Sequence, residues 1–202
     1  MIRNGLKITL IIALMLAGFS SCNIFEGGST SNTVLFVTNI TDEGQMVPIF
    51  SNVASVANTL AEATLVAQPI DPDLDINDTS YYYTVIVEQI DVEYSRSDGL
   101  SQEGKDIPFA FSQSVHKTVE IGESVTLPFS IIQHVAKQEP PLLDLLGYNV
   151  DINIPDSWTE EKVLKLEAKV TFHGTDLGGH RIEPVVATVS VFCGNFGTDV
   201  DQ

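Results

Sequence analysis

The sequence predicts an all-β protein in which two antiparallel sheets pack face to face as a sandwich. After residue 33, short segments rich in Val, Ile, Thr and aromatic residues alternate apolar and polar positions, and turn-forming residues separate them. A run of seven to nine such strands is typical of an antiparallel sandwich. The chain of 202 residues is also long enough to bury a substantial core.

The expected strands follow one another with one helical interruption. We place them at 34–40, 46–53, 60–68, 81–94, 106–111, 115–121, 124–135, 163–173 and 185–193. The stretch 46–70 is the least periodic, and its alanines leave a helix over 53–65 as the alternative to two strands.

The strand at 81–94 changes parity in its middle. Its apolar residues occupy odd positions up to Val87 and even positions from Ile90 onward. Successive side chains of a strand point to opposite faces, so this change needs an extra residue or burial on both faces. We therefore expect a β-bulge near Glu88-Gln89 or a stretch that is buried on both sides.

Prolines mark two further features. Pro128 lies within the alternating segment 124–135 and cannot donate a backbone hydrogen bond, which predicts an edge strand or a bulged one. Pro140-Pro141 and Gly147 bound an apolar run. This arrangement predicts a short helix near 140–147 that covers one end of the sandwich.

The last two strands should pair as a hairpin. Even positions from Leu164 to Phe172 and odd positions from Val185 to Cys193 are apolar. In an antiparallel pair, both apolar sets share one face only if the numbers of paired residues sum to an odd value.

The turn between these strands suggests their register. A two-residue turn across Leu177-Gly178 places Asp176 opposite Gly179, and the numbers of paired residues then sum to 355. This register predicts that Leu166 lies opposite Val189 on the buried face.

The segment from His173 to His180, with Gly-Thr-Asp-Leu-Gly-Gly between its two histidines, and its flanking strands resemble the end of known sandwich domains. They are similar to the final two strands of Ig-like or fibronectin-III-like domains in bacterial surface proteins. The resemblance covers roughly the last 120 residues and implies an Ig-like or fibronectin-III-like β-sandwich. The chain departs from antibody-type domains because it lacks their paired cysteines and core tryptophan, since Trp158 lies in a Pro/Asp/Ser loop.

The first 21 residues have the order of a secretion signal. Arg3 and Lys7 give a positive start, Ile8–Leu16 is almost entirely apolar, and small residues lead up to Cys22. The apolar run has about half of the ~20 residues that a membrane-spanning helix needs. We therefore expect three parts: a signal over 1–21, a flexible tether over 22–33 and one β-sandwich domain over 34–202.

Phe19-Ser20-Ser21-Cys22 resembles the lipobox of bacterial lipoproteins, whose cysteine is acylated and becomes the mature N-terminus. The resemblance implies lipidation of Cys22 and a membrane anchor. In that family, Asp after the cysteine retains some proteins at the inner membrane, so Asn23 implies the outer membrane. The alternative is cleavage after Ser20 and a secreted or periplasmic protein, in which Cys22 is a free thiol or forms a disulfide with Cys193.

Charge excludes some partners. The signal holds two of the ten basic residues and none of the 27 acidic ones, so the mature chain has 8 basic residues against 27 acidic ones, a formal charge of −19. Phosphate backbones and anionic headgroups repel such a chain. We expect no binding of nucleic acid, and contact with the membrane only through the lipid.

No motif for catalysis or for a cofactor is present. The sequence has no phosphate-binding glycine loop, no Gly-x-Ser-x-Gly, no His-Glu-x-x-His and no two-cysteine metal spacing. His173 and His180 form the only near pair of histidines, and the expected register places them on one outward face beside Asp176. A metal site would need a third well-placed ligand, which the sequence does not offer here. We therefore interpret these residues as part of an exposed hairpin and not as a metal site. Cys193 ends an apolar strand and is interpreted as a small core residue.

An acidic loop is the single metal candidate. It offers oxygen ligands at alternating positions, as a calcium loop does, but lacks the turn glycine and the closing glutamate of an EF-hand. We expect a solvated loop or at most a weak calcium site, with Asp71, Asp73, Asp75, Asn77 and Asp78 as its ligands. The adjacent Tyr81-Tyr82-Tyr83 suggests either packed strand aromatics or a platform for a sugar ring.

These observations predict a non-enzymatic, lipid-anchored protein of the cell envelope with a binding or structural role and no cofactor. The first alternative is an Ig-like accessory module that binds carbohydrate or a protein partner. The second is a hydrolase with an unrecognised site, against which the missing cluster of nucleophile, base and orienting group weighs.

Overall fold

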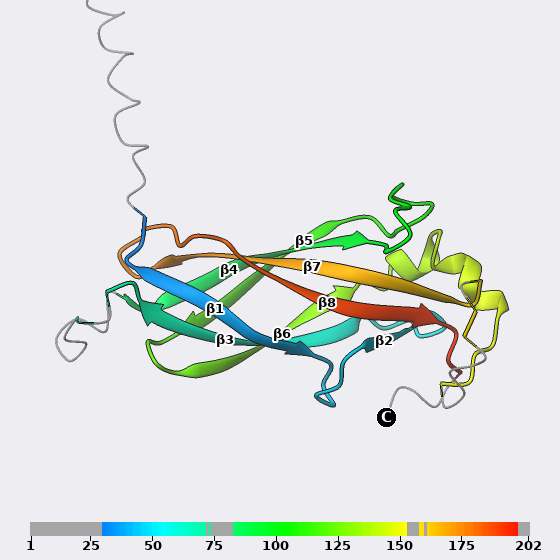
Figure 1. Cartoon of the computed structure of the whole chain (residues 1–202), viewed down its shortest axis with the longest axis horizontal. Coiled ribbons are helices and arrows are strands. Elements are labelled where there is room, and N and C mark those ends of the chain that lie inside the picture. Colours follow the sequence, from blue (N-terminus) through cyan, green and yellow to red (C-terminus); the bar gives the residue numbers. More distant parts are fainter. Residues whose placement is uncertain (1–29, 72, 74–82, 153–157, 160, 198–202) are drawn as a thin grey trace, which may run out of the picture. The chain divides into compact units, whose positions relative to one another are not determined.

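The computed structural model describes residues 30–71, 73, 83–152, 158–159 and 161–197 (Figure 1). Its strands are β1 (Thr33–Thr41), β2 (Ile49–Asn52), β3 (Thr59–Pro69), β4 (Val85–Ser95), β5 (Phe111–Val119), β6 (Ser124–Ile132), β7 (Val163–Asp176) and β8 (Val185–Gly194). The 3-10 helices η2 (Ala136–Gln138) and η3 (Leu143–Gly147) lie between β6 and β7. Among the described residues, no helical segment has the length and apolar character that a bilayer span requires. The prediction of an all-β protein is confirmed.

The strands form two sheets. One has the order β1-β3-β6 and the other β2-β8-β7-β4-β5, and every pairing of these strands is antiparallel except that of β2 with β8. The apolar sides of both sheets contribute to a single core cluster. Within it, Phe129 of β6 meets Phe172 of β7 edge to face, with ring centroids 6.0 Å apart.

Three local predictions need correction or refinement. The stretch 46–70 contains the strands β2 and β3, so the helical alternative over 53–65 is wrong. The separate strand expected at 106–111 is also wrong, because β5 begins only at Phe111 and continues without a break to Val119. The helix near 140–147 is present only as the single 3-10 turn η3, which ends at Gly147 where the backbone becomes extended at Tyr148.

The bulge expected in β4 is confirmed. Val87 pairs with Gly174 and Gln89 with His173, so Glu88 is an extra residue in β4 opposite β7. Glu88 and Gln89 are both exposed, whereas Val87 and Ile90 on either side are both buried. The extra residue thus lets both halves of β4 turn their apolar side chains into the same core.

The hairpin of β7 and β8 has the predicted parity but not the predicted register. The turn forms as expected, with the Gly179 N–H donating to the Asp176 carbonyl at 2.9 Å. Farther along the strands the numbers of paired residues sum to 357, so that Leu166 lies opposite Val191 and not opposite Val189. Between the turn and β8, the chain contains two more residues than the part of β7 that it faces. The two extra residues enter one at a time, and together they leave both apolar sets on the buried face. Gly179 has a left-handed backbone conformation (φ +81°), which accommodates the first extra residue.

The edge position of β6 is confirmed, and the structure shows how this edge is protected. Pro128 faces Glu62 of β3 and has no N–H to offer an added strand. The Gln113 side chain from β5 of the other sheet donates to the Ser130 carbonyl at 2.9 Å and accepts the Ser130 N–H at 3.1 Å. One glutamine therefore pairs with the edge backbone of β6 and joins the two sheets on this side.

Gly174 is the residue that permits the bulge. A Cβ atom at this position would lie 2.2 Å from the carbonyl oxygen of Ile86 and 3.1 Å from the Cα atom of Val87. We therefore expect Gly174→Ala to lower the free energy of unfolding by ~1–3 kcal/mol, because the β4 backbone must shift. Chemical denaturation measures the difference.

Gly147→Ala is the matched control, since nothing lies within 4 Å of a Cβ atom at Gly147. Its unfolding midpoint should stay close to that of the wild type. Equal losses in the two variants would contradict the close approach of β4 and β7.

Candidate binding site

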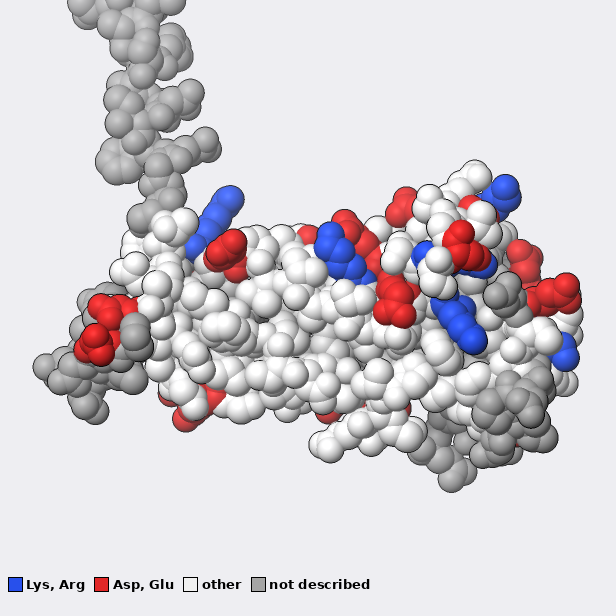
Figure 2. Space-filling model, in the orientation of Figure 1, with Lys and Arg blue, Asp and Glu red and all other residues white. Residues whose placement is uncertain are grey.

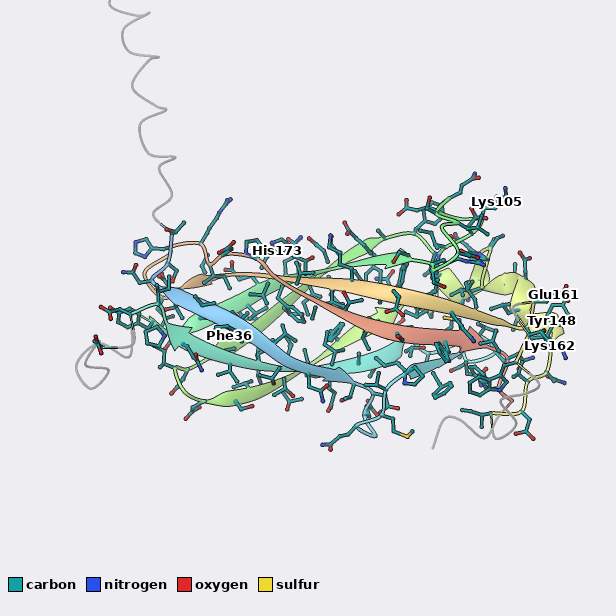
Figure 3. The ribbon with its side chains drawn as sticks, in the orientation of Figure 1. Phe36, Lys105, Tyr148, Glu161, Lys162 and His173 are labelled. Atoms are coloured by element: carbon teal, nitrogen blue, oxygen red, sulfur yellow. The ribbon has the colours of Figure 1, made fainter. Side chains whose placement is uncertain are left out.

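Several connections between strands meet at one end of the sandwich, which we call the loop end. Because β3 is antiparallel to β1 and to β6, the end of β1 lies near the start of β3 and near the end of β6. Tyr148, Glu161 and Lys162 lie together at this end (Figure 3). Loops on a rigid sheet scaffold commonly carry binding functions. The connections at the loop end are 42–48, 53–58, 96–110 and the described parts of 133–162.

A pocket of about 520 Å³ opens at the loop end. This volume falls in the range of roughly 300–1,000 Å³ that ligand pockets commonly have. We call it the loop-end pocket, and its lining residues are Asp42, Glu43, Gly44, Met46, Phe50, Ser55, Ala57, Asn58, Leu60 and Ile152.

The first wall is the turn that follows β1. The Asp42 carboxylate accepts the Met46 N–H at 2.7 Å, and the Met46 carbonyl accepts the Asp42 N–H at 3.2 Å. Gln45 has a φ of +60°, which a residue with a side chain adopts only when its surroundings hold it there. The turn leaves the Met46 side chain 57% exposed. The backbone of the turn thus places an apolar side chain at the mouth of the pocket.

The second wall is the 53–58 loop, which is tied to the opposite side of the loop end. The Asn58 side chain accepts the backbone N–H of His134 with Oδ1 at 2.8 Å and donates from Nδ2 to the Ser130 hydroxyl at 3.1 Å. Behind this wall, the buried Lys137 ammonium donates to the Ala57 carbonyl at 2.8 Å. The loop is therefore held in place before any ligand arrives.

Phe50 joins the pocket to a second, smaller core. Its ring packs edge to face against Trp158, Phe192 and Phe196, with centroids 5.7, 5.9 and 5.6 Å apart. Val150 and Val163 are buried in the same cluster. These aromatic rings cover one another and so stiffen the base of the pocket.

Charged side chains are distributed unevenly over the molecule. In the view of Figure 2, most of the area over β1 and β3 is free of them, and several lie toward the loop end. The outward positions of β3 hold one acidic residue, Glu62, among Leu, Thr, Val and Gln side chains. Asp42 and Glu43 bring two carboxylates to the pocket, whose lining includes no Lys or Arg among the described residues.

The calcium candidate lies mostly outside the described residues. Asp75, Asn77 and Asp78 are among the residues that the structure does not describe, as is Cys22. Asp71 accepts the backbone N–H of Asp73 at 3.0 Å, a local turn that gives no sign of ligation. Among the residues described, no cluster of three or more His, Cys, Asp or Glu side chains is placed to hold a metal ion.

Of the expected grouping of His173, His180 and Asp176, only the contact between His180 and Asp176 forms, and Asp176 does not lie on the outward face. Asp176 points inward and is 5% exposed, because the strand turns it to the core side. His180 bonds to it with Nδ1 3.1 Å from Oδ2, whereas the His173 Nε2 lies 2.7 Å from the Asp91 carboxylate on the outward face.

Each of these aspartates also accepts a hydrogen bond from a serine. Burial alone would raise the pKa of Asp176, but hydrogen bonds from His180 and Ser31 outweigh it and hold the pKa below its ordinary value. The Ser112 hydroxyl is the main cause of the lowered pKa of Asp91. In both groups the carboxylate lies between serine and histidine. A serine nucleophile instead needs the histidine as its direct partner, so neither group has the order of a catalytic triad.

The interpretation of Cys193 as a core residue is confirmed. Its side chain is fully buried among the apolar residues of both sheets. Burial raises the pKa of the thiol to about 12. A thiol in this setting is protonated at neutral pH and is a poor nucleophile.

Sequence reasoning missed the loop-end pocket. Asp42, Glu43 and Gly44 follow the first expected strand and by themselves indicate no more than a turn. The remaining lining comes from residues between Met46 and Ile152, which the fold brings together. The one local signal was a pair of carboxylates in a turn followed closely by an exposed methionine.

No protein-family model matches this sequence, and no curated protein matches it. Among solved structures, the ApaA protein from Bordetella pertussis is 9% identical, with a TM-score of 0.34, over 82% of this chain and 97% of that one. The sporulation control protein Spo0M from Bacillus subtilis is 10% identical, with a TM-score of 0.28, over 80% of this chain and 49% of that one. Similarities at this level support no conclusion about the function of this chain.

Proposed function

We propose that this protein is a non-enzymatic, lipid-anchored envelope protein that binds a partner protein through the loop-end pocket. The observation that carries the proposal is a pocket of about 520 Å³ with exposed apolar side chains at its mouth and walls that internal hydrogen bonds hold. Such preorganisation reduces the entropy that binding would otherwise cost.

The sheet topology supports assignment of the domain to the Ig-like and fibronectin-III-like sandwiches. The strands β8, β7, β4 and β5 correspond in order to G, F, C and C′ of that architecture, and β1, β3 and β6 correspond to A, B and E.

Membrane anchoring rests on the sequence of the first 22 residues. A positive start, a short apolar run and small residues before Cys22 are the features of a lipoprotein signal. Acyl chains on Cys22 overcome the repulsion of an acidic chain from the membrane, because each buried methylene contributes ~0.8 kcal/mol. The outer membrane is the proposed location.

The two rival functions have less support. A sugar platform needs an open ring face, whereas Phe50, Trp158 and Phe192 meet edge to face, and Tyr81 and Tyr82 lie outside the described residues. A serine hydrolase needs a hydrogen bond between its serine and histidine. The described Ser, Asp and His groups place the aspartate between the other two.

The anchor is tested by Cys22→Ser in the full-length protein. The variant should move from the membrane fraction into the soluble fraction, because serine cannot accept the thioether-linked lipid. Fractionation followed by immunoblotting measures the shift. Cys193→Ala is the matched control and should stay with the membrane, since Cys193 is a core residue. Membrane retention of the Cys22→Ser protein would rule out the anchor.

Partner binding is tested by photo-cross-linking in intact envelopes. Benzoylphenylalanine in place of Met46 should give a discrete adduct with another protein, because this position lies at the mouth of the pocket. The same group in place of Phe36 is the matched control, since Phe36 is an exposed apolar residue of β1 outside the pocket. A missing adduct at Met46, or the same adducts at both positions, would contradict the proposal.

A further inference from the structure

We infer that the loop-end pocket recognises a cationic group on an apolar stem, presented by a Lys or Arg side chain of the partner protein. The inference rests on the proposed function and adds the chemistry of the ligand. It follows from three features of the pocket: its unpaired carboxylates, its apolar side chains and the charge of the whole chain.

The carboxylates of the pocket have no cationic partner within the described part of the chain. Asp42 and Glu43 both line the pocket, and neither makes an ion pair with a described residue. Asp42 uses Oδ1 to accept the Met46 N–H, which fixes the carboxylate in the turn. The Lys137 ammonium lies behind the second wall on the Ala57 carbonyl and is itself buried, so the charge at the pocket lining is negative.

The apolar side chains of the pocket suit the stem of a long basic residue. Met46 and Leu60 are 57% and 40% exposed, and Phe50 and Ile152 add to the same lining. Lysine and arginine pack their methylene stems along apolar surfaces while the charged head remains near water or a carboxylate. The thioether of methionine is flexible and adapts to such a stem.

The charge of the chain favours a cation over an anion at this site. A formal charge of −17 raises the local concentration of cations and lowers that of anions. Each exposed ion pair contributes modestly, so two carboxylates should together give a preference of about tenfold for a cation over a neutral group of the same shape. An anionic ligand would face both carboxylates without compensation.

The methyl group of Met46 offers a single-site probe of this inference. Met1 and Met15 lie in the predicted signal, so Met46 is the only methionine of the predicted mature chain. Mature protein, lipidated at Cys22 and labelled with ¹³C-methyl methionine, is reconstituted in zwitterionic micelles and titrated with n-butylammonium, n-butanol or butyrate. Butylammonium has the shape and charge of a lysine side chain, and the other two compounds differ from it in charge.

Butylammonium should shift the Met46 methyl resonance saturably and about tenfold more tightly than butanol, and butyrate should bind most weakly. The double variant Asp42→Asn, Glu43→Gln should lose the tenfold preference for butylammonium over butanol. The matched control is Glu120→Gln, Glu123→Gln, which removes the same charge at the turn between β5 and β6 and should retain the preference.

Equal affinity for the three compounds in the wild type would overturn the inference, as would a preference that persists in the double variant. Either result leaves binding at the pocket intact, because the methyl resonance still responds. The failure of the proposed function gives a different result, namely no adduct from position 46 in envelopes. Where an adduct forms, its cross-linked segment should contain Lys or Arg, and a partner without either residue there would also overturn the inference.

Discussion

The fold depends on keeping the apolar side chains of β4 on one face of a five-stranded sheet. The parity of its sequence reverses between Val87 and Ile90, and the extra residue Glu88 absorbs the reversal. Beyond the bulge, Tyr94 still points into the core and donates from its hydroxyl to the Ile131 carbonyl of the other sheet at 2.6 Å. Burial raises the pKa of this hydroxyl, which therefore remains a donor at neutral pH. The bulge thus positions the contact that fastens the two sheets together.

The alternation of apolar and polar residues predicted which side chains face the core better than it predicted which residues pair across strands. The reversal in β4 and the common face of β7 and β8 were available from alternation alone, because burial of one face fixes which side chains point inward. The edge position of β6 was available from the missing N–H of Pro128. Register depends on how many residues the turn and its bulges absorb. The chain between Gly179 and β8 contains two more residues than a tight two-residue turn would require. The alternation within the strands does not specify that number. The need for glycine at position 174 could not be predicted locally either, because the backbone that lies close to Gly174 belongs to β4.

The candidate site was not predictable from local patterns, because its parts come from distant loops. Asp42 and Met46 lie in one turn, Leu60 begins the next long strand, and Ile152 comes from the connection before β7. Only the closed fold brings them to a single pocket. The histidines illustrate the same limit, since the actual partner of His173, Asp91, lies on β4 and 82 residues away in the sequence. Composition was informative at a coarser level, because the excess of acidic residues already argued against nucleic acid as a partner.

A pair of single-residue deletions tests the dependence of the fold on parity most directly. Deletion of Glu88 removes the bulge but leaves every apolar residue of β4 on the core face, so the protein should fold and lose at most ~3 kcal/mol, the range of ordinary substitutions. Deletion of Asp91, three residues farther along the same strand, turns Val92 and Tyr94 outward and should abolish cooperative unfolding. Denaturant melts followed by circular dichroism measure both. Equal damage from the two deletions, or a folded protein without Asp91, would contradict this account of the fold.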